Sequence, residues 1–280
     1  AGVTFAAGVF DGTGSFGGSS LVAAQFDDVF VARFDASGTC TWVQQMGGNA
    51  HNVSGIGLIP GGGTYVTGGY ASATATFGGT TLPNAGNQDV FFTRCDAGGV
   101  PIWATRLAVN AFSELSLALC VDDGGNAWVF GYQPFGSFFG STLFPGEGMF
   151  LAQYDPAGNM LQLDRPSSAY TGLHSLGPDG EHYICGQHFV DWFDATDSIT
   201  VGNTPTYEGY VARYRPDLSF HWVQECGVHQ AAYDGVADVV VGDAGTSFIC
   251  GHFNTSAIFC GDTVVLGLGV TDLFVAGRDA

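Results

Sequence analysis

Lysine is absent from the 280-residue chain, whose only strongly basic side chains are seven arginines set against 26 Asp and Glu residues. The resulting net charge of −19 repels phosphate backbones and anionic lipid surfaces. Without lysine, a Schiff base and a phosphate-binding P-loop are excluded. No apolar run reaches the roughly 18 residues of a membrane-spanning helix. We therefore expect no nucleic-acid partner and no membrane insertion.

Charged helix-forming residues are also scarce, since only 12% of the residues are charged. Glycine is abundant, with 44 residues, and phenylalanine contributes 23. Aromatic and β-branched runs interrupted by Gly, Asp and Pro are typical of short strands joined by tight turns. The composition predicts an all-β fold.

Catalytic motifs are missing as well. The sequence has no GxSxG, HExxH or P-loop, and its Gly-rich strings lack the following helix that a phosphate site needs. The acidic pairs Asp27-Asp28 and Asp122-Asp123 cannot both flank one sugar bond, because adjacent strand residues point to opposite faces. We predict no catalytic residues and no enzymatic activity, leaving open an acid pair formed between different repeats.

Seven cysteines form no CxxC pair, which argues against zinc-ribbon and thioredoxin-type sites, and most lie in apolar strand patterns as small buried residues. Cys250 and Cys260 flank a short turn at 252–256, and we predict a disulfide between them across a hairpin.

A strand ending in glycine recurs five times along the chain. Its glycines are separated by 60, 63, 55 and 65 residues; they are Gly8, Gly68, Gly131, Gly186 and Gly251. Each copy is followed by a strand such as DVFVARFD (28–35), DVFFTRCD (89–96) or DLFVAGRD (272–279), and in four copies a Phe-Gly stretch lies between the two. A tryptophan strand follows in three repeats, and a strand of small residues precedes an Asp/Gly turn in four.

Four strands about every 56 residues (280/5) fit one blade of a β-propeller per repeat. We predict a single propeller domain over residues 1–280 with about five blades, built from four-stranded repeats of roughly 55–65 residues. The repeat units are approximately 1–48, 49–107, 108–166, 167–226 and 227–280. The predicted order runs from the small-residue strand, innermost, through the two central strands to the tryptophan strand. Trp42, Trp103 and Trp222 are expected at equivalent, largely buried positions.

The turns between strands have a common chemistry. Asp35, Asp96 and Asp155 each precede a glycine by three residues, so their carboxylates are expected to accept backbone N–H groups while the glycine takes positive φ. Asp122, Asp179 and Asp243 are assigned the same structural role. Calcium is the one cofactor left open, because oxygen-rich turns suit it; otherwise we expect none.

The ordered motifs W-x4-G-G, D-x-G-x-x-Y-V-T-G, F-G-G-x-x-L and D-V-F-V-A-R-F-D-x-x-G-x3-W resemble the bacterial and archaeal β-propeller repeats of the SBBP type. The resemblance extends over the whole chain, is best at 28–104 and 220–279, and is weakest at 159–208. It implies a propeller fold and an extracellular or cell-surface location. It brings no catalytic motif.

Several residues are candidates for binding. His188 and His252 follow the repeat glycine at nearly matching places, and His51, His174 and His229 lie in or near the small-residue strands, although no metal site is predicted from them. Asn52 and Asn254 begin glycosylation sequons in predicted loops. Aromatic residues near loop tips are candidates for stacking on sugars; they are Tyr132, Phe135, Phe138, Phe139, Tyr170, Trp192 and Phe193.

The leading hypothesis is a non-enzymatic structural or adhesive module, a subunit or segment of a larger surface assembly or fibre. A lectin-like propeller that binds carbohydrate is the first alternative, and a propeller glycoside hydrolase or lyase is the second. The chain opens on a glycine-ending strand and stops at Asp279-Ala280, where a tryptophan strand is due. We therefore expect one outer and one inner strand to come either from more chain or from partner proteins that pair with the terminal strands.

Overall fold

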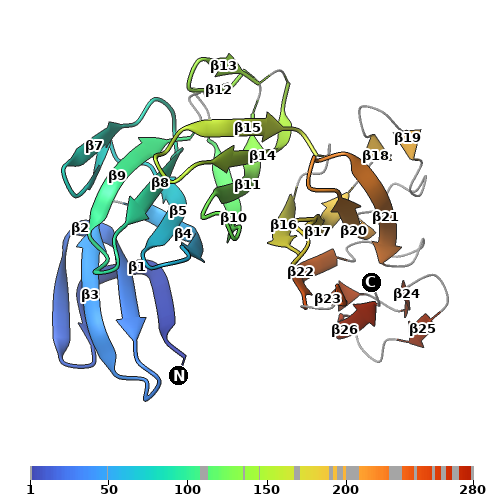
Figure 1. Ribbon diagram of the computed structural model, residues 1–280, viewed down its shortest axis with the longest axis horizontal. Helices are drawn as coiled ribbons and strands as arrows, with labels where there is room; N and C mark the ends of the chain where they lie inside the picture. The colour runs from blue at the N-terminus through green and yellow to red at the C-terminus, as the bar shows by residue number, and fades with distance from the viewer. Residues whose placement is uncertain are drawn as a thin grey trace. The chain divides into compact units, whose positions relative to one another are not determined.

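The structure is a computed structural model of the chain. It describes residues 2–48, 50–107, 113–134, 136–144, 146–166, 171–188, 192–193, 198–199, 208–226, 235–242, 245–253, 256–259, 263–266 and 271–278. These residues form 26 β-strands and no helix (Figure 1), which confirms the all-β prediction. Consequently, the described part of the chain has no helix with the length and apolar character needed to cross a membrane.

Three sheets have four strands in the predicted spatial order. Sheet 2 consists of β4 (Ala50–Leu58), β5 (Thr64–Tyr70), β8 (Asp89–Cys95) and β9 (Pro101–Arg106). Sheet 3 consists of β10 (Leu115–Val121), β11 (Ala127–Gln133), β14 (Gly148–Tyr154) and β15 (Met160–Asp164). Sheet 4 consists of β16 (Thr171–Leu176), β17 (His182–His188), β20 (Glu208–Tyr214) and β21 (Phe220–Cys226). The small-residue strand and the tryptophan-type strand therefore occupy opposite edges.

The first and last sheets have three strands each. Sheet 1 consists of β1 (Thr4–Phe16), β2 (Ser19–Phe34) and β3 (Cys40–Met46), and it lacks a small-residue strand. Sheet 5 consists of β22 (Gly235–Val241), β23 (Ser247–Phe253) and β26 (Asp272–Arg278), and the described residues give it no outer strand. Each sheet lies within one predicted repeat.

Small hairpins lie between the two central strands, and in four of the five repeats they contain the Phe-Gly stretch. In sheet 1 the stretch is the tip of the β1–β2 hairpin, whereas later repeats have separate two-stranded hairpins. These are β6 (Thr74–Phe77) with β7 (Thr80–Pro83), β12 (Phe138–Phe139) with β13 (Thr142–Leu143), β18 (Trp192–Phe193) with β19 (Ser198–Ile199), and β24 (Ser256–Phe259) with β25 (Thr263–Leu266).

The contacts divide the chain into two compact units. Unit 1 comprises 1–147 and 152–163, and unit 2 comprises 148–151 and 164–280. Within unit 1, a buried core joins sheets 1 and 2 through Val29, Val31, Val66 and Phe91. Within unit 2, a second core joins sheets 4 and 5 and includes Val211, Cys185 and Ile249. The single propeller domain over 1–280 stays a prediction.

The recurring glycine has a steric cause that the fold makes visible. Gly8, Gly68 and Gly251 each lie opposite an aromatic residue of the next strand: Phe30, Phe91 and Phe274. A Cβ atom at these glycines would lie 2.9, 2.9 and 2.8 Å from the ring. The phenylalanine therefore covers a position where no side chain fits, as in aromatic rescue of glycine in sheets. The Phe-Gly hairpin adds a second ring, because Phe16 and Phe77 lie 4.8 and 4.7 Å from Phe30 and Phe91.

The tryptophan strands occupy equivalent positions, as predicted. Trp42, Trp103 and Trp222 lie opposite Arg33, Arg94 and Arg213 of the neighbouring strand. Each indole also packs against an aromatic ring two strands away, with centroid distances of 5.9 Å (Phe5–Trp42), 6.0 Å (Tyr65–Trp103) and 6.3 Å (Tyr183–Trp222).

The three indoles are partly buried, which agrees with the largely buried positions expected for them. Trp103 shows what covers the ring in unit 1. Its Nε1–H donates to the Pro156 carbonyl at 3.1 Å, and the indole lies against the Gly158 turn of the next repeat. Trp42 lies against the equivalent turn at Gly99.

Candidate functional site

The β26 strand has an open edge. It pairs with β23 along Asp272–Arg278, and no described strand pairs with its other side, where the equivalent strands β8, β14 and β20 carry an outer strand. Leu273 and Val275 of β26 are 85% and 79% exposed. The corresponding residues of repeat 2, Val90 and Phe92, are fully buried. The last repeat therefore exposes apolar side chains at positions that are core in an earlier repeat.

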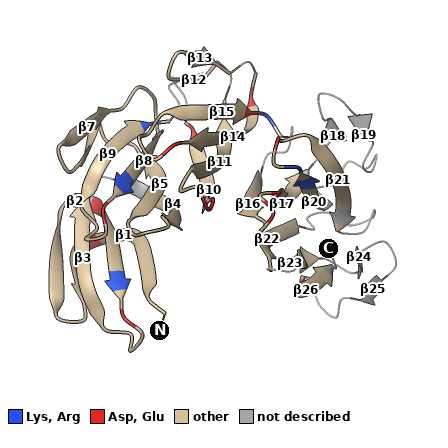
Figure 2. Cartoon of the chain, in the orientation of Figure 1, with Lys and Arg blue, Asp and Glu red and all other residues tan. Residues whose placement is uncertain are grey.

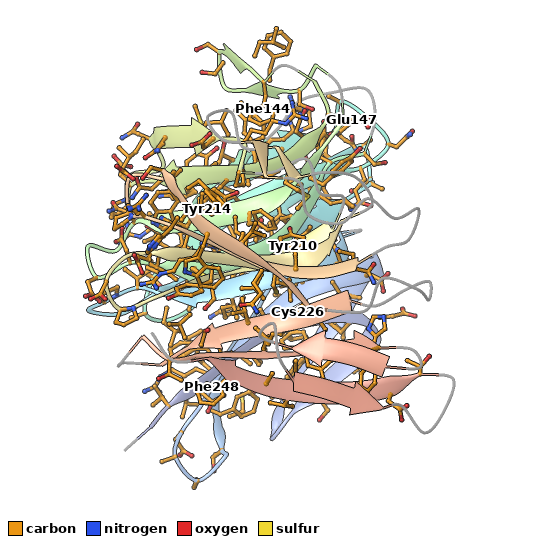
Figure 3. The ribbon with its side chains drawn as sticks, turned by 90° about the vertical axis from the view of Figure 1, so that its right-hand side faces the viewer. Phe144, Glu147, Tyr210, Tyr214, Cys226 and Phe248 are labelled. Atoms are coloured by element: carbon orange, nitrogen blue, oxygen red, sulfur yellow. The ribbon has the colours of Figure 1, made fainter. Side chains whose placement is uncertain are left out.

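This exposure extends across one face of sheet 5. Phe248 lies opposite both Val240 and Gly277, so it shares its face with Val240 and with Val275 of β26. Phe248 is 51% exposed (Figure 3) and Val240 is 58% exposed. In repeat 2 the same face contacts the following sheet, since Phe92 lies 5.2 Å from Tyr154. We call Val240, Phe248, Leu273 and Val275 the terminal apolar face.

The other end of the strand series also carries an open edge. β1 is the edge strand of sheet 1, and among the described residues it pairs only with β2. In sheets 2 to 5 the equivalent strand carries a small-residue strand on this side. Within the described ranges, sheet 1 therefore has no inner strand beside β1, and sheet 5 has no outer strand beside β26, as the strand count predicts.

The turn aspartates have structural roles, as predicted. Asp35 Oδ1 accepts hydrogen bonds from the Ser37 hydroxyl (2.6 Å) and from the N–H groups of Ser37 (2.9 Å) and Thr39 (3.0 Å). These bonds, the Ser37 hydroxyl first, lower the pKa of Asp35. Gly38 follows with φ of 80°. Asp96, Asp122 and Asp155 accept N–H groups in the same way. The prediction is wrong for Asp179, because Gly177 occupies the first position of its turn. Asp243 lies outside the described residues.

The acidic pairs do not form a two-carboxylate site. Asp28 is buried and accepts hydrogen bonds from the Ala24 N–H at 2.8 Å and from Gln45. Its neighbour Asp27 lies opposite Asp11 on the other face. Asp122 caps its turn while Asp123 is exposed. Figure 2 marks in colour where the described Asp, Glu and Arg residues lie along the ribbon.

A buried acidic pair that the sequence did not indicate lies in unit 1. Asp89 is fully buried and forms an ion pair with Arg106 at 3.0 Å. Glu114, also fully buried, accepts a hydrogen bond from Ser137 at 3.4 Å. Burial, and next the charge of Asp89, raise the pKa of Glu114 to about 7. Asp89 begins the DVFFTRC strand, so the sequence predicts its place in the sheet. Glu114 belongs to the next repeat and comes near Asp89 only through tertiary packing.

The histidines separate into different environments. His174 and His182 share the β16–β17 hairpin; their rings are stacked, with 3.0 Å between His174 Nε2 and His182 Nδ1. Burial lowers the pKa of both, that of His182 to about 4. His252 is half-buried on β23, and His188 ends β17. The side chain of His51 and all of His229 lie outside the described residues. Among the residues that the structure describes, no three His, Cys, Asp or Glu side chains are arranged to hold a metal ion.

The glycosylation and disulfide predictions are only partly covered. Asn52 lies on β4 rather than in the predicted loop, and its Oδ1 accepts the Gly69 N–H at 2.6 Å. The loop prediction is wrong because residues 50–58 pair with β5. Asn254 and Cys260 lie outside the described residues. Cys250 is half-buried on β23, so its pairing with Cys260 stays a prediction, as does glycosylation.

The aromatic residues proposed for sugar stacking do not form one surface in the described ranges. Phe139 is buried against Phe144, with centroids 5.9 Å apart, whereas Phe138 is exposed and Tyr132 is half-buried. The side chains of Trp192 and Phe193 are not among those described, nor are Phe135 and Tyr170. Phe138 is the single exposed ring among the described candidates.

A scan against models of protein families found no match, and a search of curated proteins found no similar sequence.

Proposed function

We propose that the chain is a β-propeller of about five blades that serves as a non-enzymatic structural or adhesive module outside the cell or on its surface. The recurring contact between consecutive repeats in unit 1 supports the propeller. Trp42 and Trp103 each lie against the Asp-x-x-Gly turn of the following repeat, so sheets 1 and 2 make the same kind of contact with the sheet that follows. Successive four-stranded sheets related by one repeated contact are the basis of propellers.

The open edge of β26 carries the functional part of the proposal. Among the described residues, no strand pairs with this edge. An unpaired strand edge is a template to which another chain can add a strand. The proposed role is assembly through protein partners or self-association at the terminal strands. The extracellular location rests on the resemblance of the repeats to SBBP propellers.

Sedimentation velocity over a range of concentrations tests this role. We expect the wild-type chain to associate reversibly, and the double substitution Leu273→Asp/Val275→Asp to abolish association by placing charge on the edge strand β26. The matched control is Ile102→Asp/Leu161→Asp, which changes two exposed residues of the outer strands of sheets 2 and 3. A wild-type chain that stays monomeric throughout contradicts the role. If a screen for hydrolase and lyase activity found turnover that a single substitution abolished, an enzymatic function would replace the proposed assembly role.

A further inference from the structure

The outer strands of the other repeats indicate which kind of strand would fit the open edge of β26 in sheet 5. In repeats 1, 2 and 4 the outer strand carries a tryptophan that packs on the second residue of the glycine-ending strand: Phe5, Tyr65 and Tyr183. Phe248 occupies this position in repeat 5, as the alignment of SFICGHF with TYVTGGY shows. Tyr65 is fully buried and Tyr183 nearly so, whereas Phe248 is 51% exposed. Phe248 is therefore an aromatic platform at the position that a tryptophan covers elsewhere.

The strand next to this platform leaves room for the tryptophan. Arg33, Arg94 and Arg213 separate the paired rings in the other repeats, but Gly277 stands at that position in β26. A Cβ added at Gly277 would lie 3.3 Å from the Phe248 ring. The ring therefore lies over the glycine, next to the open edge. An incoming residue paired with Gly277 would reach the exposed side of Phe248.

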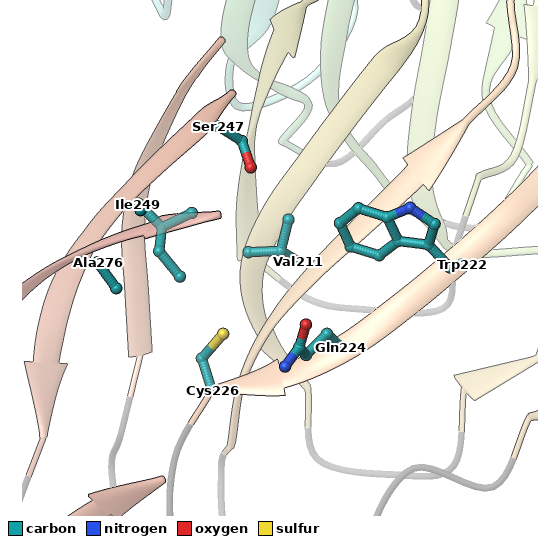
Figure 4. Close-up of a pocket in the computed structure, with 8 residues that line it drawn as sticks. Val211, Trp222, Gln224, Cys226, Ser247, Ile249 and Ala276 are labelled. Atoms are coloured by element: carbon teal, nitrogen blue, oxygen red, sulfur yellow. The ribbon is translucent and has the colours of Figure 1, made fainter. Parts of the chain in front are cut away.

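A small cavity lies behind the same edge. Its volume is about 20 Å³, and Val211, Trp222 and Gln224 of sheet 4 face Ile249 and Ala276 of sheet 5 across it (Figure 4). In repeat 2, Thr93 corresponds to Ala276, and its outer-strand partner is Ala104. Ala104 packs into the core between sheets 1 and 2. A strand added to β26 would place its equivalent of Ala104 at this cavity, one residue after its tryptophan.

We infer that the open edge of β26 is an acceptor site for an extended peptide segment with the pattern of this protein's own outer strands, in which a tryptophan is followed by a small apolar residue. The segment would bind by strand addition: its backbone pairs with β26, its tryptophan covers Phe248, and its next residue fills the cavity. The inference deepens the proposed assembly role by naming the partner, a repeat-type strand supplied by another module.

The test uses a labelled peptide with the sequence of residues 98–107 (GGVPIWATRL), the outer strand of repeat 2. Fluorescence anisotropy with the 280-residue chain should show saturable binding, and a scrambled peptide of identical charge should show none. Replacing the peptide tryptophan with alanine should weaken binding about tenfold or more, since it removes a buried aromatic contact. Hydrogen exchange of residues 272–278 should slow when the peptide binds, which ring stacking alone would not cause.

A matched pair of chain variants locates the site. Phe248→Ser should weaken binding about tenfold or more, and Phe248→Tyr should retain it. Leu161→Ser changes an equally exposed apolar residue on β15, away from sheet 5, and should have little effect. Absence of peptide binding, or equal loss in Phe248→Ser and Leu161→Ser with unchanged melting, would overturn the acceptor site. Peptide uptake by a chain that stays monomeric would instead overturn self-association while leaving the acceptor site intact.

Discussion

Replacement of Trp103 with alanine is the most informative test of how consecutive repeats are held together. The indole contacts Phe92 at a centroid distance of 5.2 Å and Tyr65 at 6.0 Å, and it donates a hydrogen bond to Pro156 of the next repeat. Truncation of a buried aromatic residue costs about 3–5 kcal/mol, and half-burial places Trp103 at the lower end of that range. The lost hydrogen bond accounts for about 1 kcal/mol of this cost. We expect Trp103→Ala to lower the free energy of unfolding by about 3 kcal/mol.

Thermal unfolding followed by circular dichroism measures this loss without depending on tryptophan fluorescence. For a chain of this size, 3 kcal/mol corresponds to a decrease in Tm of about 6–12 °C. Ile102→Ala is the control, because Ile102 is the preceding residue on β9 and is 52% exposed; it should cost less than about 1 kcal/mol. Trp103→Phe keeps a ring and should lose about 1 kcal/mol. Equal effects of Trp103→Ala and Ile102→Ala would refute the role of the indole as the link between repeats.

Three further outcomes follow from particular residues. Gly68→Ala should destabilise the fold strongly, because its Cβ would collide with the Asn52 carbonyl and the Phe91 ring, whereas Gly79→Ala has open space and should be tolerated; comparing denaturation midpoints checks this pair. Glu114 has a raised pKa of about 7 in the folded chain, so its stabilising effect is present below about pH 4.5 and lost as the pH rises through 7. The free energy of unfolding of Glu114→Gln should therefore exceed that of the wild type at pH 8 but not at pH 4. Urea titrations at both pH values measure this difference, and a difference that does not change with pH would contradict the prediction. Burial raises the pKa of Cys95 and Cys185 to about 12, so iodoacetamide should leave both thiols unmodified in the native chain and alkylate them in denaturant. Half-buried Cys40 should react faster in the native chain. Peptide mass spectrometry measures the labelling, and early modification of Cys95 would count against its burial.

The strands and turns of the repeats can be predicted from the sequence because the interactions that determine them are local. Asp35 and Gly38 mark a turn through hydrogen bonds and positive φ that span only a few residues. The repeat glycines, such as Gly68, recur at the same position of the glycine-ending strand, because a ring from the neighbouring strand leaves no room for a side chain there. Strand order within each sheet follows from these signals.

The parts that sequence reasoning missed depend on packing between distant segments. The Phe-Gly stretches were visible as a motif, but only the fold shows that Phe77 folds back onto Phe91. The sequon at Asn52 is expected in a loop, yet its segment pairs with β5. Glu114 meets Asp89 through tertiary packing, which no spacing rule predicts.

Electron cryomicroscopy of the 280-residue chain tests the central claim, that consecutive repeats are blades around one axis, most directly. Class averages viewed along that axis should show about five sheets arranged radially around a central channel, with the fifth one strand short at its outer edge. An extended row of sheets without a common axis, or a two-layer sandwich, would contradict the propeller and the assembly role built on it.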